Sequence, residues 1–192
     1  MKELTSDKKM LTAADLVTLR AMEIVSPLYK NESGDIKNPT AEYILDFVCE
    51  KAAQQFLKDG GLYSSALSAT VNDVYEGLPN LATELEFDSI AFYEKHKKSV
   101  IRDAESYCEK YAMDFYDIPG FDYTDRLIKT DANKEALAKF VLYETFCDLK
   151  DGIKNFRNDL EKIPDLFRDR RGDKNNLKPV IKNVQQEQEI LK

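Results

Sequence analysis

The sequence contains no tryptophan, a single histidine and three cysteines among its 192 residues. A phosphate-binding glycine loop, a Cys-x-x-Cys pair and a nucleophile elbow are all absent, which removes the commonest sequence signs of an enzyme or a zinc site. Cys49, Cys108 and Cys147 lie far apart within apolar patterns, which favours reduced, buried thiols over a disulfide framework. We therefore expect no cofactor, no metal ion and no catalytic residue.

Long apolar runs are also missing. No stretch reaches the roughly 18 apolar residues that a membrane-spanning helix needs, and residues 1–9 lack the apolar core of a signal peptide. We expect a protein of the cytoplasm with no membrane contact.

Positive charge is scarce in one part of the chain. The formal net charge is −7, and residues 41–96 hold 10 acidic but only 3 basic residues. Such a chain repels nucleic acid unless a local basic group, here Arg168, Arg170, Arg171 and Lys174, overrides the repulsion. Direct binding of nucleic acid is therefore not expected, and basic proteins are the partners that this charge favours.

Apolar residues recur with helical spacing along nearly the whole chain. We predict an all-α fold, a compact bundle of about six to seven helices in one domain over residues 1–168, with a polar C-terminal tail at 169–192 that is flexible or docks on a neighbour. The spacing places Leu19 and Tyr75 among the inward-facing residues. Residues 83–87 alternate with a period of two, so we expect at most one short extended segment near 81–87. The predicted helices run from Thr12 to about Ser26, Thr40 to Gly60, Ser64 to Gly77, Asp88 to about Met113, 132–149, and around 153–163.

An aspartate-rich stretch at residues 114–126 combines four aspartates with aromatic residues. It lacks the alternating ligands, the central glycine and the final glutamate of an EF-hand loop. Pro119 and Gly120 indicate a turn, in which aspartates commonly bond to the local backbone. The stretch is predicted to be a structural loop or, as the alternative, a partner-contact surface formed by Asp117, Asp122, Tyr123 and Asp125.

Two single polar residues remain open as functional groups. His96, the one histidine, has no nucleophile near it in sequence and is expected to pack on its helix rather than to act as a base. Glu144 lies within the most apolar helix, so it is either paired internally or directed into a cleft.

The acidic excess itself is the strongest candidate for a binding site. Glu42, Asp46 and Glu50 lie four residues apart on one helix face, and a charged face is usually only solvated. The alternative is that carboxylates on a rigid surface imitate nucleic-acid phosphates and occupy the basic channel of a nuclease. The candidate surface comprises Glu42, Asp46, Glu50, Asp73, Glu76, Glu84 and Glu86.

Two segments carry a resemblance to a known family. They are residues 88–96, Asp-Ser-Ile-Ala-Phe-Tyr-Glu-Lys-His, followed by Val100 and Ile101, and Asn133-Lys134 with residues 137–145, Leu-Ala-Lys-Phe-Val-Leu-Tyr-Glu-Thr. Over roughly 67–149 the chain resembles a family of small acidic proteins encoded by bacteriophages, plasmids and other mobile elements. The resemblance implies a shared helical core and an accessory role, commonly the disabling of a host defence protein.

These observations lead to one hypothesis and two alternatives. The hypothesis is a non-catalytic anti-defence inhibitor of the anti-CRISPR or antirestriction type that binds a basic host protein. The first alternative is a structural or regulatory helical module that forms a homodimer through Leu160, Ile163, Phe167, Val180, Ile181 and Val184. The second is a metal-dependent, nucleic-acid-cleaving enzyme built from Asp114, Asp117, Asp122, Asp125 and Glu144.

Overall fold

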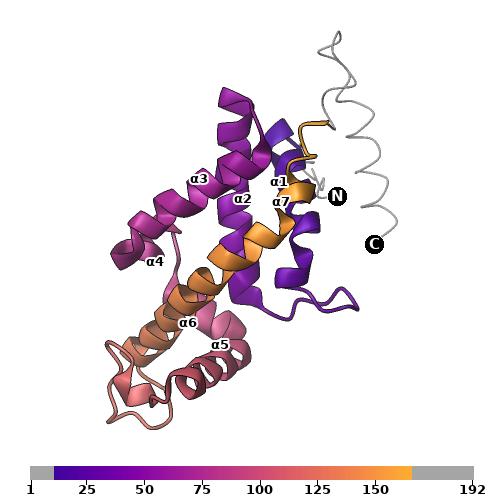
Figure 1. Ribbon diagram of the computed structural model, residues 1–192. Helices are drawn as coiled ribbons and strands as arrows, with labels where there is room; N and C mark the ends of the chain where they lie inside the picture. Colours follow the sequence, from indigo (N-terminus) through magenta and orange to yellow (C-terminus); the bar gives the residue numbers. More distant parts are fainter. Residues whose placement is uncertain (1–10, 166–192) are drawn as a thin grey trace, which may run out of the picture.

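The computed structural model describes residues 11–165, and within them the fold is all-α, as predicted (Figure 1). An isolated β-bridge between Lys30 and Ile36 closes the loop after the first helix. The α-helices are α1 (Ala13–Ile24), α2 (Pro39–Asp59), α3 (Tyr63–Glu76), α4 (Leu81–Glu84), α5 (Ser89–Tyr111), α6 (Asp131–Gly152) and α7 (Arg157–Leu160). Short 3-10 turns occupy Ser26–Leu28, Leu78–Asn80, Phe115–Asp117 and Ile153–Phe156.

Local side-chain caps explain where the long helices begin. Thr12 forms a capping box with Asp15 at the start of α1, and Asn38 accepts a hydrogen bond from the backbone N–H of Ala41 at the start of α2. Asp88 and Thr130 cap α5 and α6 in the same way. Each cap satisfies a backbone donor that the helix itself leaves without a partner.

Helices α2 and α6 form the centre of the molecule. The second helix packs against α1, α3 and α6, and α6 also packs along α5 (Figure 1). Their contact faces are almost fully buried, as for Leu45 and Val48 on α2 and for Leu137 and Val141 on α6. Burial of such aliphatic side chains contributes roughly 1.5–3 kcal/mol each, so this shared core fixes the mutual placement of the outer helices.

The segment near 81–87 differs from the extended conformation that its alternating pattern predicts. Residues 81–84 form the single helical turn α4, and Glu86 adopts a left-handed backbone with φ 51°. Leu85 and Phe87 are both buried although they lie on opposite sides of Glu86. The alternation therefore reflects a buried helical turn and the residues that leave it, because no strand within residues 11–165 offers this segment the hydrogen bonds of a sheet.

Two inward-facing assignments and one helix need correction. Leu19 is 42% exposed and Tyr75 is 41% exposed, with the ammonium group of Lys150 lying over the Tyr75 ring. The long helix α5 is interrupted at His96, whose φ of −123° and ψ of 28° are not helical.

The predicted tail at 169–192 lies outside the described residues. Among residues 11–165, no helix has the length and apolar character needed to cross a membrane.

Candidate functional site

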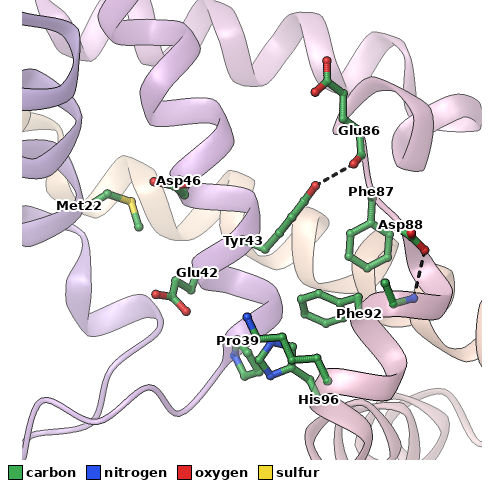
Figure 2. Close-up of a pocket in the computed structure, with 12 residues that line it drawn as sticks. Met22, Pro39, Glu42, Tyr43, Asp46, Glu86, Phe87, Asp88, Phe92 and His96 are labelled. Carbon is green, nitrogen blue, oxygen red and sulfur yellow. Dashed lines mark hydrogen bonds between the residues drawn. The ribbon is translucent and has the colours of Figure 1, made fainter. Parts of the chain in front are cut away.

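A groove of about 500 Å³ lies where α1, α2, the 86–88 connection and the first turns of α5 meet. Figure 2 shows the side chains of Glu42 and Asp46 on one side and the aromatic rings on the other. The groove is lined by Met22, Pro39, Glu42, Tyr43, Asp46, Glu86, Phe87, Asp88, Ala91, Phe92, Lys95 and His96.

Four rings form a continuous aromatic row in this groove: Tyr43, Phe87, Phe92 and His96. The ring centroids of Tyr43 and Phe87 are 5.2 Å apart, those of Phe87 and Phe92 are 4.9 Å apart, and those of Phe92 and His96 are 4.7 Å apart. The Tyr43 hydroxyl donates to the carbonyl oxygens of Leu85 at 2.8 Å and Glu86 at 3.0 Å. This bond fastens the 85–86 turn to α2 and fixes the edge of the row.

The carboxylates facing this row are electrostatically unfavourable in the folded protein. Desolvation by burial, followed by the nearby Asp46 charge, raises the pKa of Glu42, and desolvation raises the pKa of Asp46 as well. Lys30 and Lys95 act on Glu42 in the opposite direction without forming an ion pair with it. Asp46 is nevertheless exposed overall, so water screens part of the electrostatic cost of its charge.

His96 is half-buried at the interruption of α5, beside Phe92. Desolvation and the neighbouring Lys95 lower the pKa of its imidazole, which is therefore neutral at pH 7. The contact between the His96 and Phe92 rings agrees with the prediction that His96 packs on its helix. His96 also lines the groove, which the sequence did not indicate. Tyr43 and Phe87 were also missed, and the one local signal was the four-residue spacing of Phe92 and His96 on a single helix face.

The seven predicted acidic surface residues do not form one patch. Glu42, Asp46 and Glu86 line the groove, whereas Asp73 and Glu84 line a separate hollow of about 570 Å³ together with Lys51 and Lys58. Glu50 and Glu76 are exposed outside both. The fold thus divides these acids between the groove beside α5 and a hollow between α2 and α3.

What these seven carboxylates share is the lack of a cationic partner. None forms an ion pair or a side-chain hydrogen bond within residues 11–165. Acids elsewhere on the surface do pair, as in Lys110–Asp148, Arg157–Glu161 and Lys162–Asp159. The seven acids therefore carry negative charge that no ion pair neutralises, as do Glu32, Glu105 and Glu109 elsewhere in residues 11–165.

The aspartate-rich loop directs its carboxylates toward its own backbone. Asp122 accepts from the backbone and hydroxyl of Thr124, and Asp125 accepts from the backbone N–H groups of Leu127, Lys129 and Thr130. These bonds lower the pKa of both aspartates. Asp117 closes a capping box with Asp114, while Tyr123 is 67% exposed. The structural-loop interpretation accounts for the hydrogen bonds of the aspartates. Of the four proposed contact residues, Asp117, Asp122 and Tyr123 are exposed and Asp125 is half-buried.

The five carboxylates of the proposed metal-dependent enzyme are not assembled into a site. Glu144 accepts a hydrogen bond of 2.6 Å from the Tyr111 hydroxyl. Of the two roles predicted for Glu144, internal pairing or a position in a cleft, this bond corresponds to internal pairing. Asp114, Asp117, Asp122 and Asp125 serve their local turns. Within residues 11–165, no group of three or more His, Cys, Asp or Glu side chains is placed to hold a metal ion.

Two of the six residues proposed for a dimer contact lie in the core of this chain. Leu160 and Ile163 are each 1% exposed in the core of this chain, so they are not available to a second copy. Phe167, Val180, Ile181 and Val184 lie outside the described residues.

No family model, curated protein or solved structure matches this chain. The resemblance to proteins of mobile elements therefore stays a prediction, and the functional argument depends on the groove and its charges.

Proposed function

We propose that this protein is a non-catalytic inhibitor, made by a phage or other mobile element, that binds a basic host defence protein through its acidic surface. Acting in the cytoplasm of the bacterial host, it would occupy the nucleic-acid channel of a nuclease in the manner of an anti-CRISPR or antirestriction protein. It needs no cofactor for this and makes no direct contact with nucleic acid or membrane.

The observation that carries the proposal is the set of seven unpaired carboxylates. Charged residues on a protein surface commonly have partners of opposite sign close by, as Asp148, Asp159 and Glu161 do in this chain. Where two of the seven carboxylates lie close together, as those of Glu42 and Asp46 do, their mutual repulsion raises the energy of the folded state. A basic protein surface relieves that repulsion on binding, and the same field accelerates the encounter.

The rigid support of the acidic surface also favours binding without chemistry. Glu42, Asp46 and Glu50 project from a helix of 21 residues whose opposite face lies in the core. Their four-residue spacing corresponds to a separation of about 6 Å along the helix axis, so the three carboxylates form a regular row of negative charge. A partner that reads a row of phosphates can therefore meet a comparable row of charges.

The test has two stages. Tagged protein is first used to capture partners from a nuclease-treated bacterial lysate, and bound proteins are identified by mass spectrometry. The captured partner is then purified and its affinity measured for the wild type, for Glu42→Lys/Asp46→Lys/Glu50→Lys, and for Glu135→Lys/Asp151→Lys/Asp159→Lys. The second triple variant has the same net charge but changes acids that pair with neighbouring lysines.

We expect capture of a basic nuclease whose binding weakens with salt, is abolished by the first triple variant and is retained by the second. Inhibition of the nuclease should follow the same order. Equal binding by both triple variants, or recovery of the bait alone, contradicts the proposal.

A further inference from the structure

We propose that the groove between α2 and α5 receives an arginine side chain of the partner protein. This inference deepens the proposed function, on which it rests, by assigning one contact within the acidic surface. The occupant is a guanidinium group on a basic segment, held between the aromatic row and the carboxylates of Glu42 and Asp46.

The aromatic row supplies flat apolar surface on one side of the groove. Tyr43 and Phe92 are half-buried, so part of each ring remains open to a ligand while the rest is held by the core. Figure 2 shows Phe92 beside His96 at the base of the groove and Tyr43 directed toward Glu86. Arginine stacks on such rings more readily than lysine, because its guanidinium is planar and weakly hydrated.

The opposite side of the groove supplies charge. Glu42 and Asp46 lie one helical turn apart on α2, and neither has an ion-pair partner among the described residues. Their raised pKa values record a local desolvation that an incoming cation would offset. A guanidinium carries five N–H donors, enough to reach both carboxylates together.

His96 and Lys95 also influence which cation the groove can bind. Neutral His96 presents one nitrogen that accepts a hydrogen bond, so it adds an acceptor for a donor-rich ligand without adding positive charge. Lys95 lines the same groove and opposes binding of a bare cation by repulsion. Arginine offsets that repulsion by stacking, whereas a compact ammonium group has no stacking contribution of comparable size.

The experiment uses two fluorescein-labelled probes, a short peptide of alternating arginine and glycine and its lysine counterpart. Fluorescence anisotropy gives their affinities for the full chain, for the groove variant Glu42→Gln/Asp46→Asn and for the control variant Glu105→Gln/Glu109→Gln, which changes two exposed acids on α5. Both double variants remove the same charge, but the control residues lie outside the groove. Thermal melts establish that each variant is folded.

We expect the groove variant to weaken binding of the arginine peptide by at least about tenfold and the control variant by less than about threefold. The wild type should bind the arginine peptide several-fold more tightly than the lysine peptide. Phe92→Leu, which keeps an apolar side chain but removes the ring, should abolish that preference.

Equal losses in the two double variants would show that only the overall charge attracts the peptide, and would overturn the inference. A wild type that binds both peptides equally would overturn it as well. If neither peptide binds but a basic nuclease is still captured and inhibited, the arginine site is wrong and the proposed function stands. If the arginine peptide binds in the groove but no basic protein is captured, the site is supported and the proposed inhibitor function fails.

Discussion

Asn133 holds the backbone of Asp122 with both atoms of its side-chain amide. Its Oδ1 accepts from the Asp122 N–H at 2.6 Å, and its Nδ2 donates to the Asp122 carbonyl oxygen at 2.8 Å. Asn133 is fully buried in the first turn of α6, whereas Asp122 lies on the exposed loop. The aspartate-rich loop is thus attached to the core through its backbone, which leaves its carboxylates to stabilise local turns.

Replacing Asn133 by alanine should destabilise the protein. The change leaves the Asp122 N–H and carbonyl without their partner, which costs about 1–3 kcal/mol for a buried or half-buried polar group. For a chain of this length a loss of 1 kcal/mol corresponds to roughly 2–4 °C in Tm. Circular dichroism melts measure the effect, with Lys129→Ala in the same loop as a control that removes no side-chain bond. An unchanged Tm in Asn133→Ala would argue against this attachment.

The Tyr43 hydroxyl should stabilise the turn that follows α4. Tyr43→Phe removes the bonds to the Leu85 and Glu86 carbonyls but keeps the ring in the aromatic row. We expect a loss of about 1 kcal/mol in the free energy of unfolding, seen in urea denaturation. Hydrogen exchange of residues 85–88 should rise while α3 is unaffected, and uniform protection in both proteins would contradict the prediction.

Removing the charge of the groove acids should stabilise the folded protein at neutral pH. A folded-state pKa above the unfolded value means that the protonated carboxyl favours folding below the unfolded pKa, and that this stability is lost as pH rises through the folded pKa. Because water screens these groups, we expect Glu42→Gln/Asp46→Asn to raise Tm at pH 7 by only about 1–3 °C.

The gain should vanish as the pH approaches about 4, where the wild-type carboxyls also become neutral. Glu50→Gln/Glu76→Gln is the matched control, with an expected change smaller than that of the groove variant. A lower Tm for the groove variant at pH 7 would mean that the two acids stabilise the fold, and would remove the argument that their charges serve binding.

The cysteines should differ in reactivity. Burial raises the pKa of the Cys49 thiol to about 12, and its backbone carbonyl accepts a hydrogen bond of 3.0 Å from Tyr63. Cys147 is partly exposed, although desolvation raises the pKa of its thiol also. With iodoacetamide at pH 8, peptide mapping should find Cys147 modified first and Cys49 modified only after unfolding. Rapid labelling of native Cys49 would contradict its place in the core.

The helix starts were predictable because the signals are local. Thr12, Asp88 and Thr130 each bond to a backbone group within three residues, so their role follows from neighbours in the chain. The turn at 81–87 was not predictable in this way. Its alternating pattern is compatible with a strand, and only the burial of Leu85 and the bond from Tyr43 select the helical form.

The sequence by itself determined the all-α class, the concentration of negative charge in residues 41–96 and the turn character of the aspartate-rich stretch, because each depends on composition or on contacts within a few residues. Only the tertiary structure decided which acids share a groove. Glu42 and Glu86 are 44 positions apart and line the same groove because α2 and the start of α5 pack together, whereas Asp73 on α3 lines a different hollow. The sequence of a helix determines which of its faces carry charged side chains. The packing of that helix against its neighbours determines which of those side chains line the same groove.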